Sequence, residues 1–189
     1  KGRRDGQDFI GEVYKAGVRN FVISDAEIDR SAYTNANFFL VDNTLIALQK
    51  LAGYHRSKFN YPVIAITGSN GKTIVKEWLY QLLAPENNII RSPKSYNSQI
   101  GVPISVWEMN EENDLAIFEA GISKVGEMEN LARIIKPTIG ILTNIGEAHN
   151  EGFASREEKI SEKLKLFKDV DLFIYSHHYL KGYTGDIPG

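Results

Sequence analysis

The chain has 189 residues, 42% of them hydrophobic and 24% charged, which is typical of a globular chain that can bury a core without staples. The absence of cysteine excludes disulfide bonds and thiolate metal sites, and a net charge of −2 with interspersed signs excludes a basic nucleic-acid footprint. No apolar run reaches membrane-spanning length and the N-terminus lacks a secretory apolar region, so we expect no membrane span. The absence of cysteine is compatible with the reducing cytoplasm, where we expect the protein to be located. Because the chain begins without Met and ends in KGYTGDIPG, we also expect it to be a fragment.

Short helices and strands alternate over the first sixty residues. The expected elements are a helix over residues 8–16, strands at 20–24 and 37–41, and a helix over 44–58. Gly17 is a good stop for the first helix, and Asn60-Tyr61-Pro62 breaks the last one. We therefore expect a domain boundary near residue 60, with part of a small α/β domain before it.

From Pro62 onward, apolar strands alternate with helices. The expected strands are 63–67, 115–119, 139–143 and 172–175, and the expected helices are 72–84, 127–136 and 155–168. Ser155 and Glu158 match a capping box, and Trp78, Leu82 and Trp107 are expected in the core. The alternation predicts a doubly wound α/β fold with a mostly parallel sheet, whose ligands bind at the carboxyl ends of the strands.

A glycine-rich loop between the first of these strands and its helix is the strongest local signal. Its residues are Thr67, Gly68, Ser69, Asn70, Gly71, Lys72 and Thr73. In that setting backbone amides and the helix N-terminus can hold a polyphosphate, Lys72 can reach the β- and γ-phosphates, and Thr73 can offer a hydroxyl to Mg²⁺. The general phosphate-loop pattern has a glycine where this chain has Ile66, and the alternative is a glycine-rich turn with an ordinary surface lysine.

Several segments together resemble the Mur ligase family. They are ITGSNGKT (66–73), YNSQIGVP (96–103), FEAG (118–121), TNIGEAH (143–149) and EGF (151–153). VKEWL (75–79), HxEGF and DGQDF (5–9), in which Gln7 replaces a His, resemble the branch that adds D-alanyl-D-alanine to a peptidoglycan precursor. The resemblance covers residues from about 5 to 175 and rests on several independent segments.

The resemblance implies three domains, of which this chain would hold two in part. Residues 1–60 would end the N-terminal domain that holds the uridine nucleotide, residues 61–189 would form most of the central ATPase, and the C-terminal ligase domain would be absent. The implied reaction joins D-alanyl-D-alanine to UDP-N-acetylmuramoyl-tripeptide through an acyl phosphate, with ATP and two Mg²⁺ ions. We expect a monomer with no nucleic-acid partner.

The same resemblance implies a set of catalytic residues. Lys72 would hold phosphate, Thr73 and Glu119 would bind the first Mg²⁺, and His149 would bind the second. His149 alone would be interpreted as a structural histidine, because imidazole suits softer metals. Asn144 is expected either to orient its loop or to form a plain turn.

Lys163 falls where the family has a lysine that CO₂ converts to a carbamate, an anionic ligand for the second Mg²⁺. Such a reaction needs the neutral amine, which burial favours. The alternative is a solvated lysine on a helix rich in charge, and Lys159, one turn earlier, is the second candidate for the modified residue.

Asn97, Ser98 and Gln99 offer polar groups suited to a sugar or pyrophosphate of the substrate, although an ordinary polar loop is an equal alternative. For the whole chain, the alternatives are another Mur or folylpolyglutamate-type ligase with a different acceptor, a nucleotide-binding module that is inactive as this fragment, and a plain interaction domain.

Overall fold

The computed structural model describes residues 5–146 and 152–188, and the chain divides into two compact units, residues 1–47 and 48–189. The division falls within α2 (Thr44–Arg56), whereas the sequence places a boundary near residue 60. The reason is that the second half of α2 belongs to the larger unit, where Ala52 is fully buried in the core.

The smaller unit contains two parallel strands and a short helical segment. Its elements are η1 (Gly6–Phe9), α1 (Ile10–Lys15), β1 (Asn20–Ile23) and β2 (Asn37–Leu40). Ile10, Phe21 and Ile23 form its core, and Phe21 stacks on Phe38 at 5.1 Å between ring centroids. The side-chain oxygen of Gln7 accepts the backbone N–H groups of the turn after β1, which fixes η1 to that strand.

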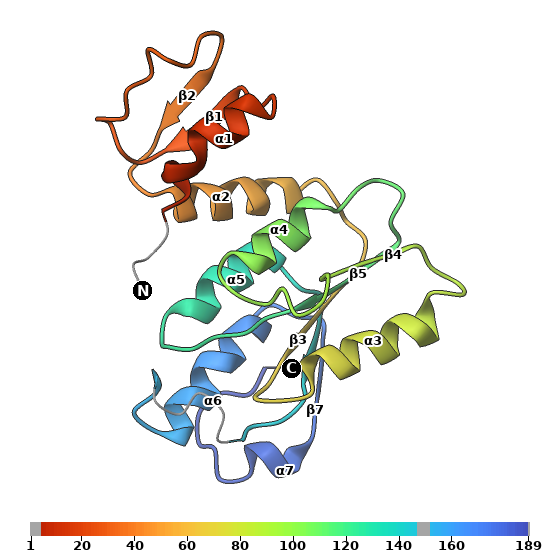
Figure 1. The fold of residues 1–189 in the computed structure, drawn as a ribbon. Helices are drawn as coiled ribbons and strands as arrows, with labels where there is room; N and C mark the ends of the chain where they lie inside the picture. Colours follow the sequence, from red (N-terminus) through yellow and green to blue (C-terminus); the bar gives the residue numbers. More distant parts are fainter. Residues whose placement is uncertain (1–4, 147–151, 189) are drawn as a thin grey trace. The chain divides into compact units, whose positions relative to one another are not determined.

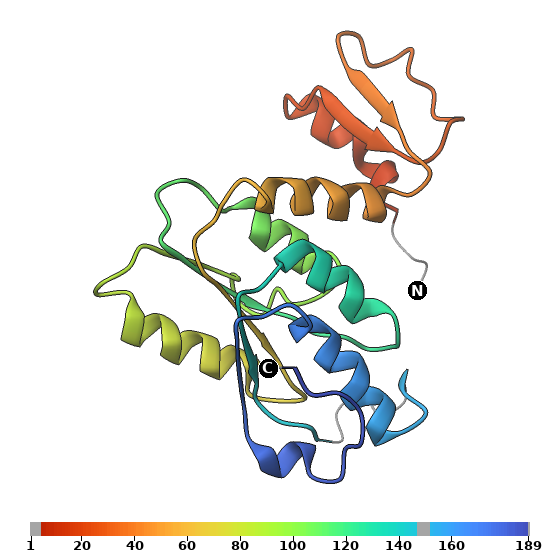
Figure 2. The same cartoon turned by 180° about the vertical axis from the view of Figure 1, so that it is seen from behind.

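The larger unit is built on a five-stranded parallel sheet with strand order β4-β5-β3-β6-β7 (Figures 1 and 2). The strands are β3 (Val63–Thr67), β4 (Ile89–Arg91), β5 (Leu115–Glu119), β6 (Ile139–Leu142) and β7 (Leu172–Tyr175). Every residue of β3 and β5 is buried, as their continuous apolar sequences predict for strands covered on both faces. The expected doubly wound α/β fold is confirmed.

Helices cover both faces of this sheet (Figures 1 and 2). α3 (Lys72–Leu83) packs on one face, and α4 (Gly101–Trp107), α5 (Glu127–Ile135) and α6 (Arg156–Leu164) lie on the other. The chain continues through η3 (Lys165–Phe167) and α7 (His177–Leu180). The capping box at α6 is confirmed, because Ser155 Oγ accepts from Glu158 N at 3.0 Å. None of the helices formed by the described residues has the length and apolar character required to cross a bilayer.

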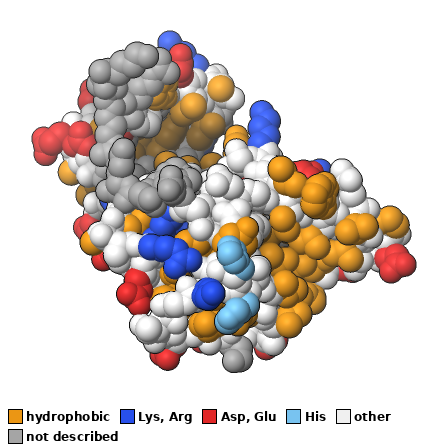
Figure 3. Space-filling view, turned by 90° about the horizontal axis from the view of Figure 1, so that it is seen from below, with side chains coloured by type: hydrophobic (Ala, Val, Ile, Leu, Met, Phe, Trp, Pro, Cys, Tyr) orange, Lys and Arg blue, Asp and Glu red, His pale blue; other side chains and the backbone are white. Residues whose placement is uncertain are grey.

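The expected burial of three large apolar side chains is wrong. Trp78 is 62% exposed, Leu82 is 75% exposed and Trp107 is 54% exposed. On α3, the stripe that packs on the sheet is Val75, Leu79 and Leu83, so Trp78 and Leu82 lie on the flank of the helix that faces away. Figure 3 shows hydrophobic side chains gathered on the side of the molecule where α3 lies.

Candidate nucleotide and metal site

The predicted phosphate loop joins β3 to α3 at the carboxyl edge of the sheet, and the neighbouring strand ends hold it in place. Thr67 Oγ1 donates to the carbonyl of Ala120, just after β5, at 2.8 Å. On the other side, Ser69 Oγ accepts from Gly146 N at 2.9 Å and its backbone N–H donates to the carbonyl of Asn144 at 3.0 Å. The loop is therefore fixed between the segments that follow β5 and β6.

Gly68 is required at its position by space as well as by backbone conformation. Its φ is +150°, which L side chains rarely adopt. A Cβ added there would overlap Thr143 Oγ1 and would lie 3.0 Å from Asn144 N. The first glycine of the motif thus lets the loop pass against the end of β6.

The N-terminus of α3 is open to an anion. Gly71 occupies the N-cap position with φ +80° and provides no side-chain cap. Within the described part of the chain, the backbone N–H groups of Gly71, Lys72 and Thr73 donate no hydrogen bond, whereas those of Ser69 and Asn70 donate to Asn144. Unpaired N–H groups and the positive end of the helix dipole together favour a bound phosphate.

Lys72 lies over this opening. Its Nζ donates to the carbonyl of Gly68 at 2.8 Å, so the ammonium folds back onto the loop. Burial lowers the pKa of Lys72 and the Glu119 carboxylate opposes that shift. A cation held in a partly buried position beside a polyphosphate site interacts more strongly than one in water.

Glu119 ends β5 beside Thr73, although 46 residues separate them in sequence. The carboxylate is fully buried, and its Oε2 accepts from Thr73 Oγ1 at 3.0 Å and from Asn97 Nδ2 at 3.5 Å. Two neighbouring oxygen ligands of an octahedral Mg²⁺, each at about 2.1 Å, lie about 3 Å apart. The separation and chemistry of Thr73 Oγ1 and Glu119 Oε2 therefore fit a single Mg²⁺ ion.

Lys76 is a residue of this site to which the sequence analysis gave no role. Its side chain is fully inaccessible, and Nζ lies 3.0 Å from Glu119 Oε1. The available signal was position: Lys76 lies four residues after Lys72 on the same helix, within the VKEWL segment.

The interpretation of Lys163 as a solvated lysine is wrong, because Lys159, Glu162 and Lys163 are at most 3% exposed. Burial, together with the positive charges of Lys72 and Lys159, lowers the pKa of Lys163 to about 7. Lys159 Nζ donates to the carbonyl of Gly146 at 2.6 Å. The inward face of α6 thus carries two lysines toward the phosphate loop.

The buried carboxylate of Glu162, on the same helix, is stabilised by its hydrogen-bond partners. Its Oε1 accepts from the N–H groups of Gly126 and Met128, at 2.8 and 3.0 Å, at the N-terminus of α5. Its Oε2 pairs with Lys165 at 2.7 Å. These bonds join α6 to α5 and hold the face that carries Lys163.

The three predicted substrate residues differ in their surroundings. Asn97 lies at the site, with its side chain near Glu119 and its carbonyl accepting from Gly121 N at 2.7 Å. Ser98 Oγ accepts from Gly101 N at 3.1 Å. Gln99 donates to the carbonyl of Glu127 at 3.0 Å, so these two side chains fasten the loop to α4 and α5.

His149 lies outside the described residues, so its predicted place in the metal site stays a prediction. Over residues 5–146 and 152–188, His, Asp and Glu side chains form no group of three suited to a metal ion.

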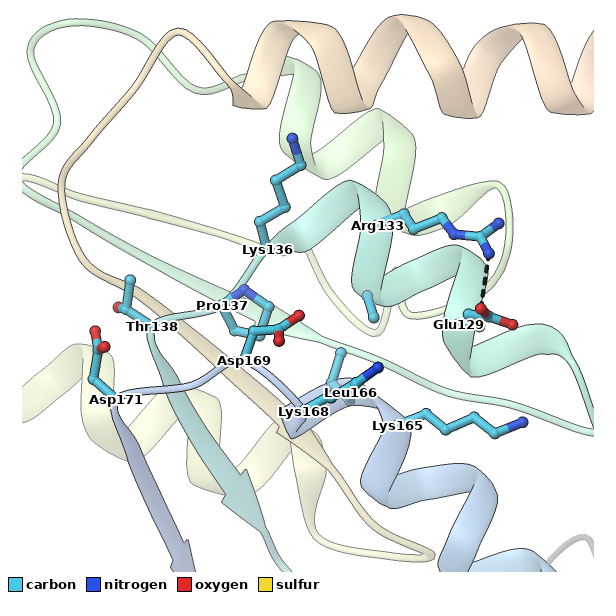
Figure 4. A pocket seen from close by; sticks show the side chains of 11 residues that line it. Glu129, Arg133, Lys136, Pro137, Thr138, Lys165, Leu166, Lys168, Asp169 and Asp171 are labelled. Atoms are coloured by element: carbon cyan, nitrogen blue, oxygen red, sulfur yellow. Dashed lines mark hydrogen bonds and ion pairs between the residues drawn. The ribbon is translucent and has the colours of Figure 1, made fainter. Parts of the chain in front are cut away.

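A separate cavity of about 620 Å³ lies at the opposite edge of the sheet (Figure 4). Thr138 and Asp171, which precede β6 and β7, line it together with residues of α5 and η3. Its charges are mixed, and Arg133 pairs with Glu129 at 2.8 Å across one side (Figure 4). Because nucleotides bind at the carboxyl edge of such sheets, this cavity is not the nucleotide site.

Comparison with known proteins identifies relatives of the domain that carries the phosphate loop. The Mur ligase middle domain model matches residues 66–178. A UDP-N-acetylmuramoyl-tripeptide–D-alanyl-D-alanine ligase from Borreliella burgdorferi is 38% identical over 90% of this chain, and one from Bacillus subtilis is 35% identical over 93%. The chain spans 38% and 39% of the lengths of these two relatives.

The solved structures that match this chain include MurF ligases. A crystal structure of MurF from Acinetobacter baumannii matches 93% of this chain with a TM-score of 0.82 and 27% identity, over 39% of its own chain. MurF ligase from Thermotoga maritima, crystallised with ADP, matches 93% of this chain with a TM-score of 0.81 and 30% identity, over 41% of its own chain. The chain belongs to the Mur ligase family.

Proposed function

We propose that the protein is an ATP-dependent ligase that adds D-alanyl-D-alanine to UDP-N-acetylmuramoyl-tripeptide. The relatives and solved structures that match most of this chain have that activity in their names or carry the MurF title. The observation that carries the proposal is the arrangement at the carboxyl edge of the sheet. There the uncapped N-terminus of α3 lies beside the Thr73–Glu119 oxygen pair and the Lys72 ammonium.

ATP is the proposed cofactor, held by residues 67–73. The free N–H groups at the start of α3 would donate to the phosphate oxygens, and the Lys72 ammonium would move from the Gly68 carbonyl to the terminal phosphates. The Thermotoga relative was crystallised with ADP, which supports a nucleotide at this position.

Mg²⁺ is the proposed metal, with Thr73 and Glu119 as its protein ligands and water and phosphate oxygens completing the shell. When bound, the ion would neutralise charge that develops on the transferred phosphoryl group. Asn97 would stay close enough to orient the Glu119 carboxylate.

A second Mg²⁺ would use His149 and a carbamate on Lys163. The buried position of Lys163 and its lowered pKa support this assignment, since only a neutral amine reacts with CO₂. The carbamate would replace the positive charge of Lys163 by a negative one. The repulsion of Lys163 by the positive charges of Lys72 and Lys159 would then become attraction.

The reaction would proceed in two steps. An oxygen of the tripeptide's terminal carboxylate attacks the γ-phosphorus of ATP, so that a new P–O bond forms, the bond to ADP breaks and an acyl phosphate results. The amine of D-alanyl-D-alanine then attacks the acyl carbon, phosphate leaves and the amine loses a proton. The Lys72 ammonium stabilises the phosphoryl oxygens in the first step.

Asn97, Ser98 and Gln99 lie on the loop proposed to face the tripeptide substrate, and residues 1–60 are proposed to end the domain that holds the uridine nucleotide. We place the reaction in the cytoplasm, where ATP and uridine-nucleotide precursors are made, and expect a monomer to carry it out.

The test measures phosphate release by the full-length protein with ATP, Mg²⁺ and UDP-N-acetylmuramoyl-tripeptide, with one acceptor added at a time. D-Alanyl-D-alanine should stimulate release, whereas single amino acids and folate acceptors should not. Stimulation by another acceptor would favour a different ligase of the family. Saturable nucleotide binding without release under any condition would favour a nucleotide-binding module.

A further inference from the structure

The ammonium of Lys76 joins three segments beneath the metal site. It donates to the carbonyls of Ser92, at 2.8 Å, and Lys94, both just after β4. It lies 3.0 Å from Glu119 Oε1 at the end of β5 and 3.2 Å from Glu77 Oε1 on its own helix. The side chains of Lys76 and Glu119 are both fully inaccessible, so each is the other's buried counter-charge.

The two oxygens of Glu119 have different surroundings. Oε2 receives the Thr73 hydroxyl and the Asn97 amide. Oε1 accepts no hydrogen bond from the described residues and lies 3.0 Å from the Lys76 ammonium. The carboxylate is thus held with one oxygen toward the cation beneath it and the other toward the phosphate loop.

Ser92 strengthens this arrangement from the backbone side. Its Oγ accepts from Glu119 N at 3.2 Å while its carbonyl accepts from Lys76. Lys76 therefore contacts Oε1 of Glu119 and is also bonded to Ser92, the residue that anchors the Glu119 main chain.

We propose that Lys76 is a positioning residue for metal binding: it holds Glu119 Oε1, so that Oε2 is presented beside Thr73 as the ligand of Mg²⁺. The inference rests on the proposed function, because it concerns the same metal site. Groups that orient a metal ligand commonly contribute 10–100-fold to metal affinity. Lys76 itself touches neither nucleotide nor substrate in this proposal.

The experiment measures the affinity of the full-length protein for ADP by calorimetry, once with Mg²⁺ and once with EDTA. The ratio of the two affinities is the magnesium gain. Lys76→Met should reduce this gain by about tenfold or more and should leave the affinity in EDTA nearly unchanged.

Arg56→Met is the matched control. Arg56 is also a buried cation that donates to backbone carbonyls, those of Ile135, Phe59 and Lys136. Its removal should lower thermal stability without changing the magnesium gain. Equal losses of affinity for Lys76→Met in Mg²⁺ and in EDTA would show that Lys76 only shapes the loop and would overturn the inference.

A double-mutant cycle with Glu119→Gln tests whether Lys76 acts through Glu119. Lys76→Met should have no further effect on the magnesium gain once Glu119 is neutral, and an additional loss would overturn the inference. If circular dichroism shows that Lys76→Met is unfolded, Lys76→Arg replaces it, because it keeps the charge but shifts the donors. Lys76→Arg should also lower the gain, and an unchanged gain would contradict the proposal.

The same titrations separate the two proposals. A wild-type protein without any magnesium gain would overturn the proposed metal site and this inference with it. A wild-type gain that Lys76→Met retains in full would overturn only the role of Lys76.

Discussion

Asn144 holds the main chain of Asn70 with two hydrogen bonds: its Oδ1 accepts from Asn70 N at 3.0 Å, and its Nδ2 donates to Asn70 O at 3.0 Å. The carbonyl of Asn144 also accepts from Ser69 N at 3.0 Å. A single residue, Asn144, which lies two positions after the end of β6, therefore fixes the middle of the phosphate loop. The sequence analysis expected Asn144 either to orient its own loop or to form a plain turn; the structure instead shows it bound to the phosphate loop before α3.

Asn144→Ala should weaken ADP binding by about thirtyfold, because two hydrogen bonds of about 1 kcal/mol each would no longer order the loop. Calorimetric titration of the full-length protein measures the change. Asn87→Ala is the control, since it removes the single bond from Asn87 Nδ2 to the carbonyl of Leu83 at the far end of α3. Unchanged affinity in Asn144→Ala would show that the loop keeps its shape without this clamp.

The parts of this fold that depend on local sequence were predictable. β3 and β5 begin and end at the expected residues, because a continuous apolar run bounded by polar residues defines a buried strand. The phosphate loop could be located because its glycines and Lys72 stand between such a strand and a helix.

The parts that depend on contacts distant in sequence were not predictable. β4 (Ile89–Arg91) has only three residues and carries too little pattern to be recognised. The rotation of α3 could not be fixed, because Ile74, Trp78 and Leu82 form an apolar stripe as regular as the one that packs on the sheet. The burial of Lys76 follows from its partner Glu119, which lies 43 residues further along the chain.

Gly68→Ala should abolish nucleotide binding. It should also lower the free energy of unfolding, by about 1–3 kcal/mol beyond the cost of placing an alanine at a positive φ. The added Cβ would overlap Thr143 Oγ1, and either the loop or β6 would have to move. Denaturant unfolding and ADP titration measure the two effects. Gly182→Ala provides the comparison, since Gly182 has φ +79° but open space around its Cβ position. Equal destabilisation by both substitutions would contradict the steric argument.

Lys72→Met should reduce acceptor-stimulated phosphate release by about a hundredfold or more, because a preorganised charge on the transferred phosphoryl group is lost. The affinity for ADP should fall less, since Lys72 is expected to reach the terminal phosphates. Steady-state kinetics and calorimetry separate the two effects. Lys136→Met, at the opposite edge of the sheet beside the cavity of Figure 4, should change neither. A normal turnover number in Lys72→Met would exclude the proposed role.

Carbamate formation on Lys163 should increase with pH across neutrality. With a pKa of about 7, the amine is neutral in about a tenth of molecules near pH 6 and about nine tenths near pH 8. Carbon-13 NMR of protein equilibrated with labelled bicarbonate measures the carbamate signal. Lys163→Met should remove the signal and Lys159→Met should retain it, and the reverse result would transfer the modification to Lys159.

Lys163→Met should raise thermal stability in the absence of CO₂ and metal. The folded-state pKa of Lys163 lies below its ordinary value of 10.5, so folding disfavours its protonated form. The resulting penalty is fully present below about pH 7 and decreases as the pH rises from 7 toward 10.5, because over that range the folded state has released a proton that the unfolded state still binds. The gain in melting temperature should therefore be larger near pH 6 than near pH 9, as calorimetric scans would measure. A gain that is independent of pH would assign the effect to packing alone. A loss of stability at both pH 6 and pH 9 would contradict the argument that burying the charged amine of Lys163 costs stability.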